Sequence, residues 1–251
     1  MIDTLARTRL LLGDENVEKL KKKTVMVLGL GGVGSHLTEA LARSGVGRLI
    51  LIDHDTVSLT NINRQSIAYH STIGQYKTKL MKNRIADILP DIHVKTKELF
   101  ILPENVDAIF DEEMDYVADA IDTVTAKLDV AERAIKKGIP IISCMGTGNK
   151  LYPEMFEITD ISKTSMDPLS RVMRRELKNR GIYHMKVLYS KEKPINIGSR
   201  GCTGEEKGKK RAIPGSVAFV PPVAGMMIAG EIIRDMTNLN ESEKERDYGL
   251  I

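Results

Sequence analysis

Apolar positions along the first 150 residues of the chain follow two alternating spacings. Short continuous runs rich in branched residues predict buried strands at residues 24–30, 48–52, 93–99, 116–121 and 140–144. Between these runs, apolar residues recur every three or four positions and predict helices at residues 35–44, 77–89, 103–110 and 125–137. Strands that alternate with helices in this way form a mainly parallel sheet.

The pattern is less regular beyond residue 150. Further strands are predicted at residues 155–161 and 185–189, and helices at residues 168–180 and 221–236, with Asp167 as the N-cap of the first helix. Residues 191–215 are charged and rich in glycine, which predicts a mobile loop, and residues 238–251 are expected to fray. Residues 7–21 predict an N-terminal helical arm that Gly13 interrupts.

These elements predict an α/β fold of the doubly wound, Rossmann-like kind, with a mainly parallel sheet, helices on both faces and a C-terminal extension. At 251 residues the chain is expected to form a single domain, residues 1–251. Within it we distinguish a core, residues 22–150, from a C-terminal part, residues 151–251.

Composition excludes several classes of protein. Hydrophobic residues make up 42% of the chain and charged residues 28%, which is typical of a soluble globular protein. Residues 1–16 lack an apolar leader, and the apolar stretch at 217–233 is interrupted by prolines and a glutamate, so we expect no stable membrane insertion. Two cysteines, Cys144 and Cys202, favour a reducing compartment and therefore the cytoplasm.

A glycine-rich loop, Gly29-x-Gly31-Gly32-x-Gly34, lies between the first predicted strand and the first helix. Its glycines allow the backbone to approach a phosphate, and the free N–H groups at the helix N-terminus favour the negative charge. Asp53 follows the second strand about twenty residues later, where an acid binds ribose hydroxyls. On its own, the loop is as compatible with an NAD site as with another nucleotide site.

Polar residues after the other predicted strands favour ATP over NAD. Arg64 lies in a polar segment, residues 60–65, beyond the second strand; Lys77 begins a helix, and Asp122 follows the strand at 116–121. The carboxyl ends of parallel strands meet at one edge of a sheet. A triphosphate under attack requires cations for its oxygens and a carboxylate for a metal, whereas an NAD site requires neither.

Four motifs occur in order along the chain: the glycine loop at residues 29–35, and the segments at residues 51–65, 74–77 and 119–122. In this order and at these separations, they resemble the ubiquitin-activating-enzyme-like superfamily of ATP-dependent carboxylate-adenylating enzymes. The segments Asp160–Thr164, Asp167–Leu169 and Gly215–Gly225 further resemble its tRNA threonylcarbamoyladenosine dehydratase branch. This resemblance implies ATP-driven cyclisation of the threonylcarbamoyl group of a modified adenosine in tRNA. It also implies a homodimer in which an arm arginine reaches the partner's nucleotide; by spacing this is Arg7, although Arg9 competes.

We assign roles to the candidate residues from their chemistry. Arg64 and Lys77 are expected to clamp the phosphates, and Asp122 is expected to hold Mg²⁺. As alternatives, Asp122 caps the following helix, and Lys77 is a solvated first-turn lysine. The expected nucleotide-binding residues are Gly29, Gly31, Gly32, Gly34, Asp53, Asp55, Asn61, Asn63, Arg64, Gln65, Lys77, Asp122 and Thr123. A requirement for a monovalent cation or for a sulfur-transfer protein partner is left open.

Three other functions compete with the dehydratase hypothesis. Adenylation of a small sulfur-carrier protein is disfavoured, because relatives with that activity commonly bind zinc through two CxxC pairs and this chain has only two cysteines. A non-catalytic tRNA-binding scaffold is disfavoured by the complete set of ATP motifs. An NAD-dependent oxidoreductase would be distinguished by its cofactor affinity.

Charge is concentrated in one segment of the chain. Residues 163–211 contain 14 Lys and Arg against 5 Asp and Glu, whereas the chain as a whole carries a net charge of only +3. Such asymmetry fits a polyanionic partner, although a solvated helix and loop would give the same pattern. We therefore expect tRNA to bind this segment, with Arg174, Arg175 and the run Lys209-Lys210-Arg211 as candidate contacts.

Overall fold

The computed structural model describes residues 3–198 and 214–239. Cys202, the run Lys209–Arg211, most of the predicted loop at 191–215 and most of the tail at 238–251 lie outside these described residues. Within the described ranges, no helix has both the length and the hydropathy needed to cross a lipid bilayer.

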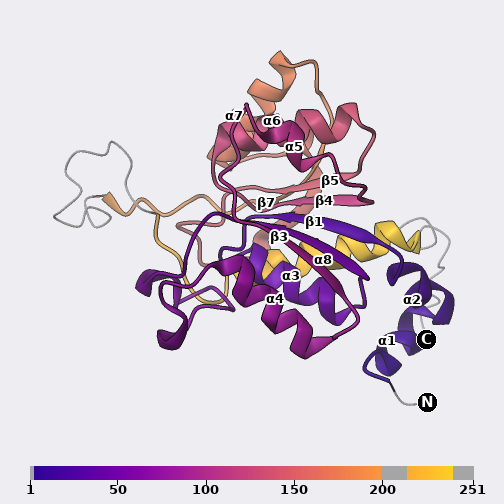
Figure 1. The fold of residues 1–251 in the computed structure, drawn as a ribbon. Helices are drawn as coiled ribbons and strands as arrows, with labels where there is room; N and C mark the ends of the chain where they lie inside the picture. Colours follow the sequence, from indigo (N-terminus) through magenta and orange to yellow (C-terminus); the bar gives the residue numbers. More distant parts are fainter. Residues whose placement is uncertain (1–2, 199–213, 240–251) are drawn as a thin grey trace, which may run out of the picture.

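A seven-stranded sheet forms the centre of the molecule, with the strand order β3-β2-β1-β4-β5-β7-β6 (Figure 1). All neighbouring strands are parallel except β6, which runs antiparallel to β7 at the edge of the sheet. The strands are β1 (Thr24–Leu28), β2 (Arg48–Ile52), β3 (His93–Lys97), β4 (Tyr116–Asp119), β5 (Ile141–Cys144), β6 (Phe156–Asp160) and β7 (Lys186–Ser190). The predicted α/β class and mainly parallel sheet are confirmed.

Helices cover both faces of this sheet, as Figure 1 shows. On one face, α3 (Gly34–Arg43), α4 (Lys77–Ile88) and α8 (Pro221–Met236) pack over one apolar cluster. On the other face, α5 (Val106–Ile109), α6 (Val124–Lys136) and α7 (Pro168–Asn179) pack over a second cluster. The N-terminal arm forms α1 (Ala6–Leu12) and α2 (Asp14–Leu20), which are separated at Gly13 as predicted.

The position of β1 inside the sheet explains why its apolar residues follow one another and do not alternate with polar ones. All five of its residues are buried. Val25 and Val27 belong to the cluster beneath α3 and α8, whereas Met26 and Leu28 belong to the cluster beneath α6 and α7. A strand that is covered on both faces needs apolar side chains at every position.

Helix α8 packs closely against α3, the helix that follows the glycine loop. Gly225 makes this approach possible, because a Cβ atom at that position would lie 2.5 Å from the carbonyl oxygen of Val33. The C-terminal part of the chain therefore supports the N-terminus of α3 directly.

Several predicted elements are shorter in the structure, and the reasons are local. The strand predicted at 24–30 ends at Leu28, because Gly29 takes a φ of +84° and turns the chain. The strand predicted at 116–121 ends at Asp119, whose side chain accepts a hydrogen bond from the N–H of Ile121 and so forms a turn. The helix predicted at 103–110 is reduced to Val106–Ile109.

Candidate functional site

The loops that carry the candidate residues meet at the carboxyl edge of the sheet, above the neighbouring strands β1 and β4. The chain passes from β1 outward to β2 and β3, and then returns to β4 on the other side of β1. The crevice at such a reversal is where doubly wound folds bind nucleotides. Each strand here contributes one loop: Gly29–Gly34 after β1, Asp53–Asp55 after β2, and Ala120–Thr123 after β4.

The glycine loop is packed so tightly that side chains cannot be accommodated at two of its positions. A Cβ at Gly34 would lie 1.8 Å from the carbonyl oxygen of Gly29, and a Cβ at Gly29 would lie 2.8 Å from that of Ala120. The loop therefore curls onto itself and against the end of β4. Within it, Gly31 and Gly32 remain partly exposed, and without side chains their backbone can approach a phosphate.

Asp53 shapes this loop from the adjacent strand. Its carboxylate is buried, and its Oδ2 atom accepts a hydrogen bond of 2.6 Å from the N–H of Leu30. Its Oδ1 atom accepts a second bond, of 2.8 Å, from the N–H of Asp55. Each carboxylate oxygen has a further lone pair for a ribose hydroxyl. Asp53, His54 and Asp55 bring potential metal ligands within 4.8 Å of one another, but the Asp53 oxygens already accept backbone hydrogen bonds.

Lys77, at the first position of α4, is buried rather than solvated. Its Nζ atom lies 2.7 Å from Oδ2 of Asp55, and its side chain is 5% exposed. The interpretation of Lys77 as a solvated first-turn lysine is therefore wrong. The buried ammonium group is held beside the loop after β2, where Asp55 balances its charge.

Arg64 lies directly over the glycine loop. A Cβ at Gly32 would meet the Cγ and Cδ atoms of Arg64 at 3.2 Å. Its guanidinium donates hydrogen bonds to the carbonyl oxygen of Thr60 and the side chain of Asn63, and it has no carboxylate partner among the described residues. Partial burial lowers the pKa of Arg64, which is the direction expected for a cation that lacks a counter-charge.

The polar segment around Arg64 is only partly directed at the crevice. Asn61 accepts a hydrogen bond from the N–H of Ser58 and so stabilises the short 3₁₀ helix Leu59–Asn61. Asn63 donates to the carbonyl oxygen of Ser216, which joins this segment to the chain before α8. Gln65 is buried next to Gly31, and its Oε1 atom has no hydrogen-bond partner among the described residues. A buried acceptor of this kind is suited to a bound ligand.

Asp122 has an exposed carboxylate at the end of the loop after β4. The N-cap of α6 is Thr123 rather than Asp122, and no side-chain capping bond is present. The interpretation of Asp122 as a helix cap is therefore wrong. Its carboxylate makes one hydrogen bond, of 3.5 Å, from the hydroxyl of Thr123, and it has no cationic partner in the described part of the chain. A free carboxylate at this edge fits the oxygen ligands that Mg²⁺ prefers.

Two buried ion pairs beneath the site were not predicted. Lys127 of α6 is fully buried, and its Nζ atom lies 2.8 Å from Asp119 and 3.0 Å from the hydroxyl of Ser143. Lys150 donates to Asp167 at 2.7 Å and to the carbonyl oxygen of Gly146 at 2.5 Å. A lysine among the apolar positions of the helix predicted at 125–137 is the signal that would have identified the first pair.

The arm provides one free arginine. Arg9 is held by Asp3, Asp14 and Glu18, and the Glu18 carboxylate above all raises the pKa of Arg9 beyond its usual range. Arg7 is exposed, and its guanidinium has no hydrogen bond or ion pair among the described residues. Of the two arm arginines, Arg7 is therefore the one available to another molecule.

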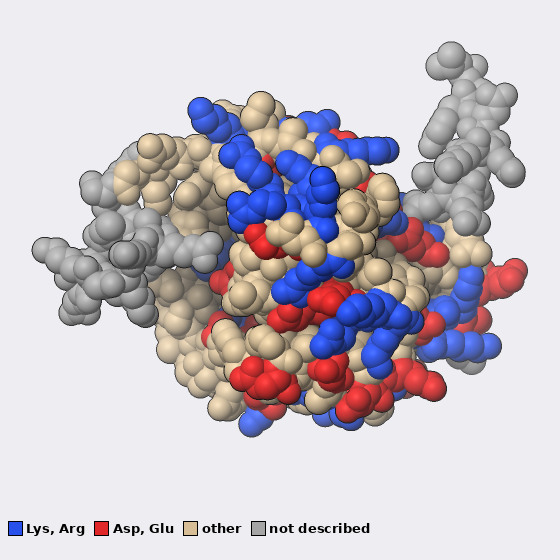
Figure 2. All heavy atoms as spheres, turned by 90° about the horizontal axis from the view of Figure 1, so that it is seen from above, with Lys and Arg blue, Asp and Glu red and all other residues tan. Residues whose placement is uncertain are grey.

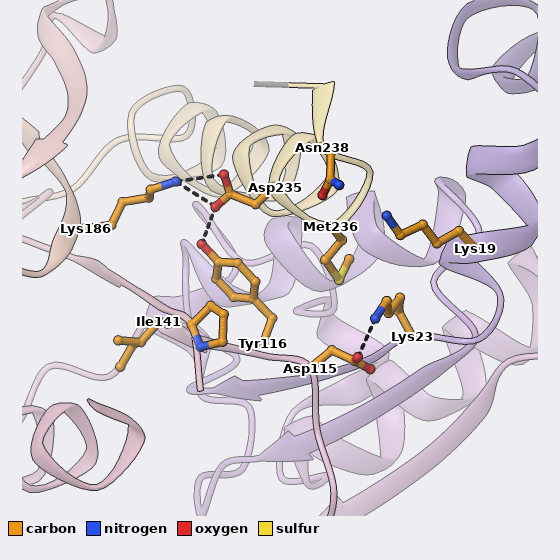
Figure 3. A pocket seen from close by; sticks show the side chains of 10 residues that line it. Lys19, Lys23, Asp115, Tyr116, Ile141, Lys186, Asp235, Met236 and Asn238 are labelled. Carbon is orange, nitrogen blue, oxygen red and sulfur yellow. Dashed lines mark hydrogen bonds and ion pairs between the residues drawn. The ribbon is translucent and has the colours of Figure 1, made fainter. Parts of the chain in front are cut away.

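A cavity of about 460 Å³ lies at the opposite, amino edge of the sheet (Figure 3). Several of its polar groups pair with one another: Lys186 and the Tyr116 hydroxyl both contact Asp235, and Lys23 pairs with Asp115. None of the candidate nucleotide residues lines this cavity. We therefore place the candidate site at the carboxyl edge, beside the glycine loop, where Arg64 and Asp122 lack a counter-charge among the described residues.

Comparison with known proteins adds evidence that is independent of this geometry. The ThiF family model matches residues 5–248. The tRNA threonylcarbamoyladenosine dehydratase of Bacillus subtilis is 44% identical over 98% of this chain and 100% of its own length. The adenylyltransferase and sulfurtransferase UBA4 of Vanderwaltozyma polyspora is 35% identical over 55% of this chain and 31% of its own length.

Solved structures are similar over nearly the whole chain. The crystal structure of E. coli tRNA N6-threonylcarbamoyladenosine dehydratase in complex with ATP has a TM-score of 0.85 and 29% sequence identity, and the match covers 95% of both chains. The same enzyme in complex with AMP has a TM-score of 0.83, with 94% of both chains covered.

Proposed function

Because this chain belongs to the ThiF family, we propose that it uses ATP to dehydrate threonylcarbamoyladenosine in tRNA. One observation carries the proposal: Arg64 lies against the glycine loop and the buried Lys77 is held beside the neighbouring loop after β2, so two cations meet a phosphate-binding loop at one edge of the sheet. The similar E. coli dehydratase was crystallised in complex with ATP. The similarity to the Bacillus subtilis dehydratase, which extends over both chains almost completely, supports this substrate.

The reaction proceeds in two steps that need no nucleophile from the enzyme. The carboxylate of the threonylcarbamoyl group attacks the α-phosphorus of ATP, and pyrophosphate leaves. The carbamoyl group then attacks the activated carbonyl carbon, a ring closes, and AMP leaves. The net change is the loss of one water from the nucleoside, with ATP converted to AMP and pyrophosphate.

The residues of the site divide these tasks among them. Arg64 stabilises negative charge on the phosphate oxygens, because its side chain lies against the glycine loop and its guanidinium has no carboxylate partner in the described part of the chain. Lys77 contributes a second positive charge and is held in place by Asp55. Asp53 accepts hydrogen bonds from the ribose hydroxyls while it fixes the loop. Asp122 would hold Mg²⁺, which would supply positive charge to shield the triphosphate.

We further propose that the enzyme is a cytoplasmic homodimer in which Arg7 of one subunit reaches the nucleotide of the other. The free guanidinium of Arg7 supports this assignment, as do two exposed leucines on the same helix, Leu10 and Leu11, which are 84% and 86% exposed. A monovalent cation and a sulfur-transfer protein remain candidate additional requirements, and no described residue argues for a specific site for either.

Nucleoside analysis of tRNA provides the direct test. The protein is incubated with ATP, Mg²⁺ and tRNA that carries threonylcarbamoyladenosine, and the digested nucleosides are separated by mass. We expect a product that is lighter by one water and that forms only when ATP is present. Release of pyrophosphate with a sulfur-carrier protein but not with tRNA would instead establish the alternative adenylation reaction.

Nucleotide affinity tests the site separately from the substrate. We expect calorimetry to show binding of ATP with Mg²⁺ and no binding of NAD. Binding of NAD without any binding of ATP would reverse the assignment and favour an oxidoreductase.

A further inference from the structure

Helix α7 carries an unusual concentration of positive charge on its outer side. Arg171, Arg174, Arg175 and Lys178 all fall within an arc of about 100° when successive residues are placed 100° apart. Arg174 is half-buried, whereas Arg171, Arg175 and Lys178 are exposed. The other exposed positions of the helix are Pro168 and Asn179, so no large apolar side chain is exposed on it. Lys163, in the short turn before α7, is exposed as well. We call Lys163, Arg171, Arg174 and Lys178 the α7 basic face.

Within the described ranges, no acid of the chain neutralises the charges of the α7 basic face. Arg171, Lys178 and Lys163 have no carboxylate within ion-pair distance among the described residues. Arg174 donates hydrogen bonds only to the carbonyl oxygen and the hydroxyl of Thr164, which are neutral groups.

Neighbouring arginines are paired, in contrast to the α7 basic face. Arg175 contacts Glu176, and Arg180 contacts Asp129 and Glu132 on α6. Figure 2 views the molecule from the side of α6 and α7, and it shows Lys and Arg side chains gathered on one part of this surface. A cluster of like charges repels itself, so it is favoured when a polyanion is bound.

The position of α7 relates this surface to the active site. Its N-cap, Asp167, is buried and accepts a hydrogen bond from Lys150, which also holds the carbonyl oxygen of Gly146 in the loop after β5. That loop lies at the same carboxyl edge as the loops after β1 and β4. Helix α7 therefore begins at the edge where the nucleotide is proposed to bind, and its basic side chains extend away from it.

We infer that the α7 basic face binds the phosphate backbone of the tRNA substrate while the modified nucleoside enters the carboxyl-edge site. This inference rests on the proposed function, because it identifies the surface on which that substrate lies. The row from Arg171 to Lys178 is about 10 Å long at 1.5 Å per residue, which is enough to follow a phosphate backbone rather than a single anion. Tyr183, 57% exposed just beyond the C-terminal end of α7, offers an aromatic surface for an unstacked base.

An anionic membrane is the other polyanion to consider. Helices that lie on membranes present a strong apolar face to the lipid in addition to basic residues. The apolar side of α7 is already occupied, because Met173 and Leu177 are fully buried in the protein. The outer side offers charge without apolar contact, and RNA is therefore favoured.

The test reverses two unpaired charges of this face and compares the result with a charge-matched control. The variant is Arg171→Glu with Lys178→Glu. The control is Lys22→Glu with Lys82→Glu, which changes the net charge equally at two exposed lysines near α2 and on α4 that have no ion-pair partner among the described residues. The affinity for tRNA is measured by filter binding between about 50 and 200 mM salt, together with the KM values for tRNA and ATP.

We expect the α7 variant to weaken tRNA binding about tenfold or more and to reduce the salt slope by about two units, one for each lost contact. The KM for tRNA should rise, whereas calorimetric ATP affinity should stay unchanged. The control should retain its salt slope. An equal loss in both variants, or no loss in the α7 variant, would overturn the inference.

Two further results separate this inference from the proposed function. If the protein of native sequence forms the cyclic nucleoside and the α7 variant binds tRNA as tightly as that protein does, the proposed function stands and this inference fails. If the α7 variant loses binding to phosphatidylserine vesicles but retains tRNA binding, the surface is a membrane contact and the inference is likewise overturned.

Discussion

At the residue scale, the proposed adenylation depends most on Arg64 and Asp122, two charged groups of the site for which the described chain provides no counter-charge. Arg64 is in contact with the glycine loop, and Asp122 projects from the loop after β4. Neither residue stabilises a helix end or a buried ion pair. Their substitution should therefore affect the chemistry far more than the fold.

We predict that Arg64→Ala and Asp122→Asn each lower the rate of pyrophosphate release by one to three orders of magnitude, about the range for removal of a preorganised charge-stabilising group. Asp122→Asn should also raise the Mg²⁺ concentration required for half-maximal activity. Asp111→Asn, at another exposed acid, is the matched control and should leave the rate unchanged. Unfolding temperatures should be similar in all variants, and near-normal rates in Arg64→Ala or Asp122→Asn would remove that residue from the mechanism.

Cys144 illustrates how burial decides the chemistry of a side chain. It ends β5 and is only 4% exposed, so it belongs to the core. Burial raises the pKa of its thiol to about 12. The thiolate is the reactive form of cysteine, so Cys144 should be inert at neutral pH.

This raised pKa predicts a specific dependence of stability on pH. The thiol ionises at about pH 8.5 in the unfolded chain but stays neutral in the folded protein. Its contribution to the free energy of unfolding is therefore complete below about pH 8.5. As the pH rises from about 8.5 towards 12, the free energy of unfolding should fall. The decline measured by urea denaturation should be shallower in Cys144→Ala. An identical slope in both proteins would contradict the buried, neutral thiol.

At the scale of elements, the cluster of Asp119, Lys127 and Ser143 joins β4, α6 and β5 beneath the site. Lys127 reaches Asp119 from a fully buried position, and the hydroxyl of Ser143 donates to the same carboxylate at 2.5 Å. The other oxygen of Asp119 accepts the N–H of Ile121 and so fixes the turn that leads to Asp122. The ion pair between Lys127 and Asp119 therefore fixes the backbone turn that carries Asp122, the proposed metal ligand.

We predict that Lys127→Met destabilises the protein by about 3–5 kcal/mol, because it leaves the charge of Asp119 buried and uncompensated. Combining it with Asp119→Asn should recover part of this loss, since the isolated charge is then removed. Urea denaturation of the single and double variants measures both effects. If Lys127→Met costs less than about 1 kcal/mol, well below the range for a broken buried pair, the ion pair does not support the site as described.

At the scale of the whole molecule, the arm decides whether one chain contains a complete site. Helix α1 presents Arg7 together with exposed leucines, whereas Arg9 is held within the arm itself by three acids. A free cation beside an exposed apolar surface suits an interface with a second copy of the chain. The proposed homodimer would place this cation at the partner's nucleotide.

Mixing two inactive variants tests this arrangement. Arg7→Ala and Arg64→Ala are each expected to be nearly inactive. If Arg7 acts across the dimer, heterodimers contain one intact site, and an equal mixture after subunit exchange should recover about a quarter of the native activity. If Arg7 acts within its own subunit, no heterodimer has a complete site, and the mixture should stay inactive.

The order of elements was determined by the sequence alone, because strand and helix periodicities are local properties. The bounds of β2 and α8 were predicted without error, and the glycine loop led to the prediction of a nucleotide site at the carboxyl end of β1. Residues that follow parallel strands must meet at one edge, so the grouping of Asp53, Arg64, Lys77 and Asp122 also followed from the sequence.

Only the tertiary structure decided which partner each polar group has. Asp55 with Lys77, Lys127 with Asp119, and Lys150 with Asp167 pair across different elements. The same is true of the strand order, in which β7 lies between β5 and β6. The sequence shows which side chains carry a charge that must be neutralised if they are buried, but it offers several possible partners for each charged side chain. Packing selects among them, because a buried charge is stable only where a particular neighbour comes within hydrogen-bond distance.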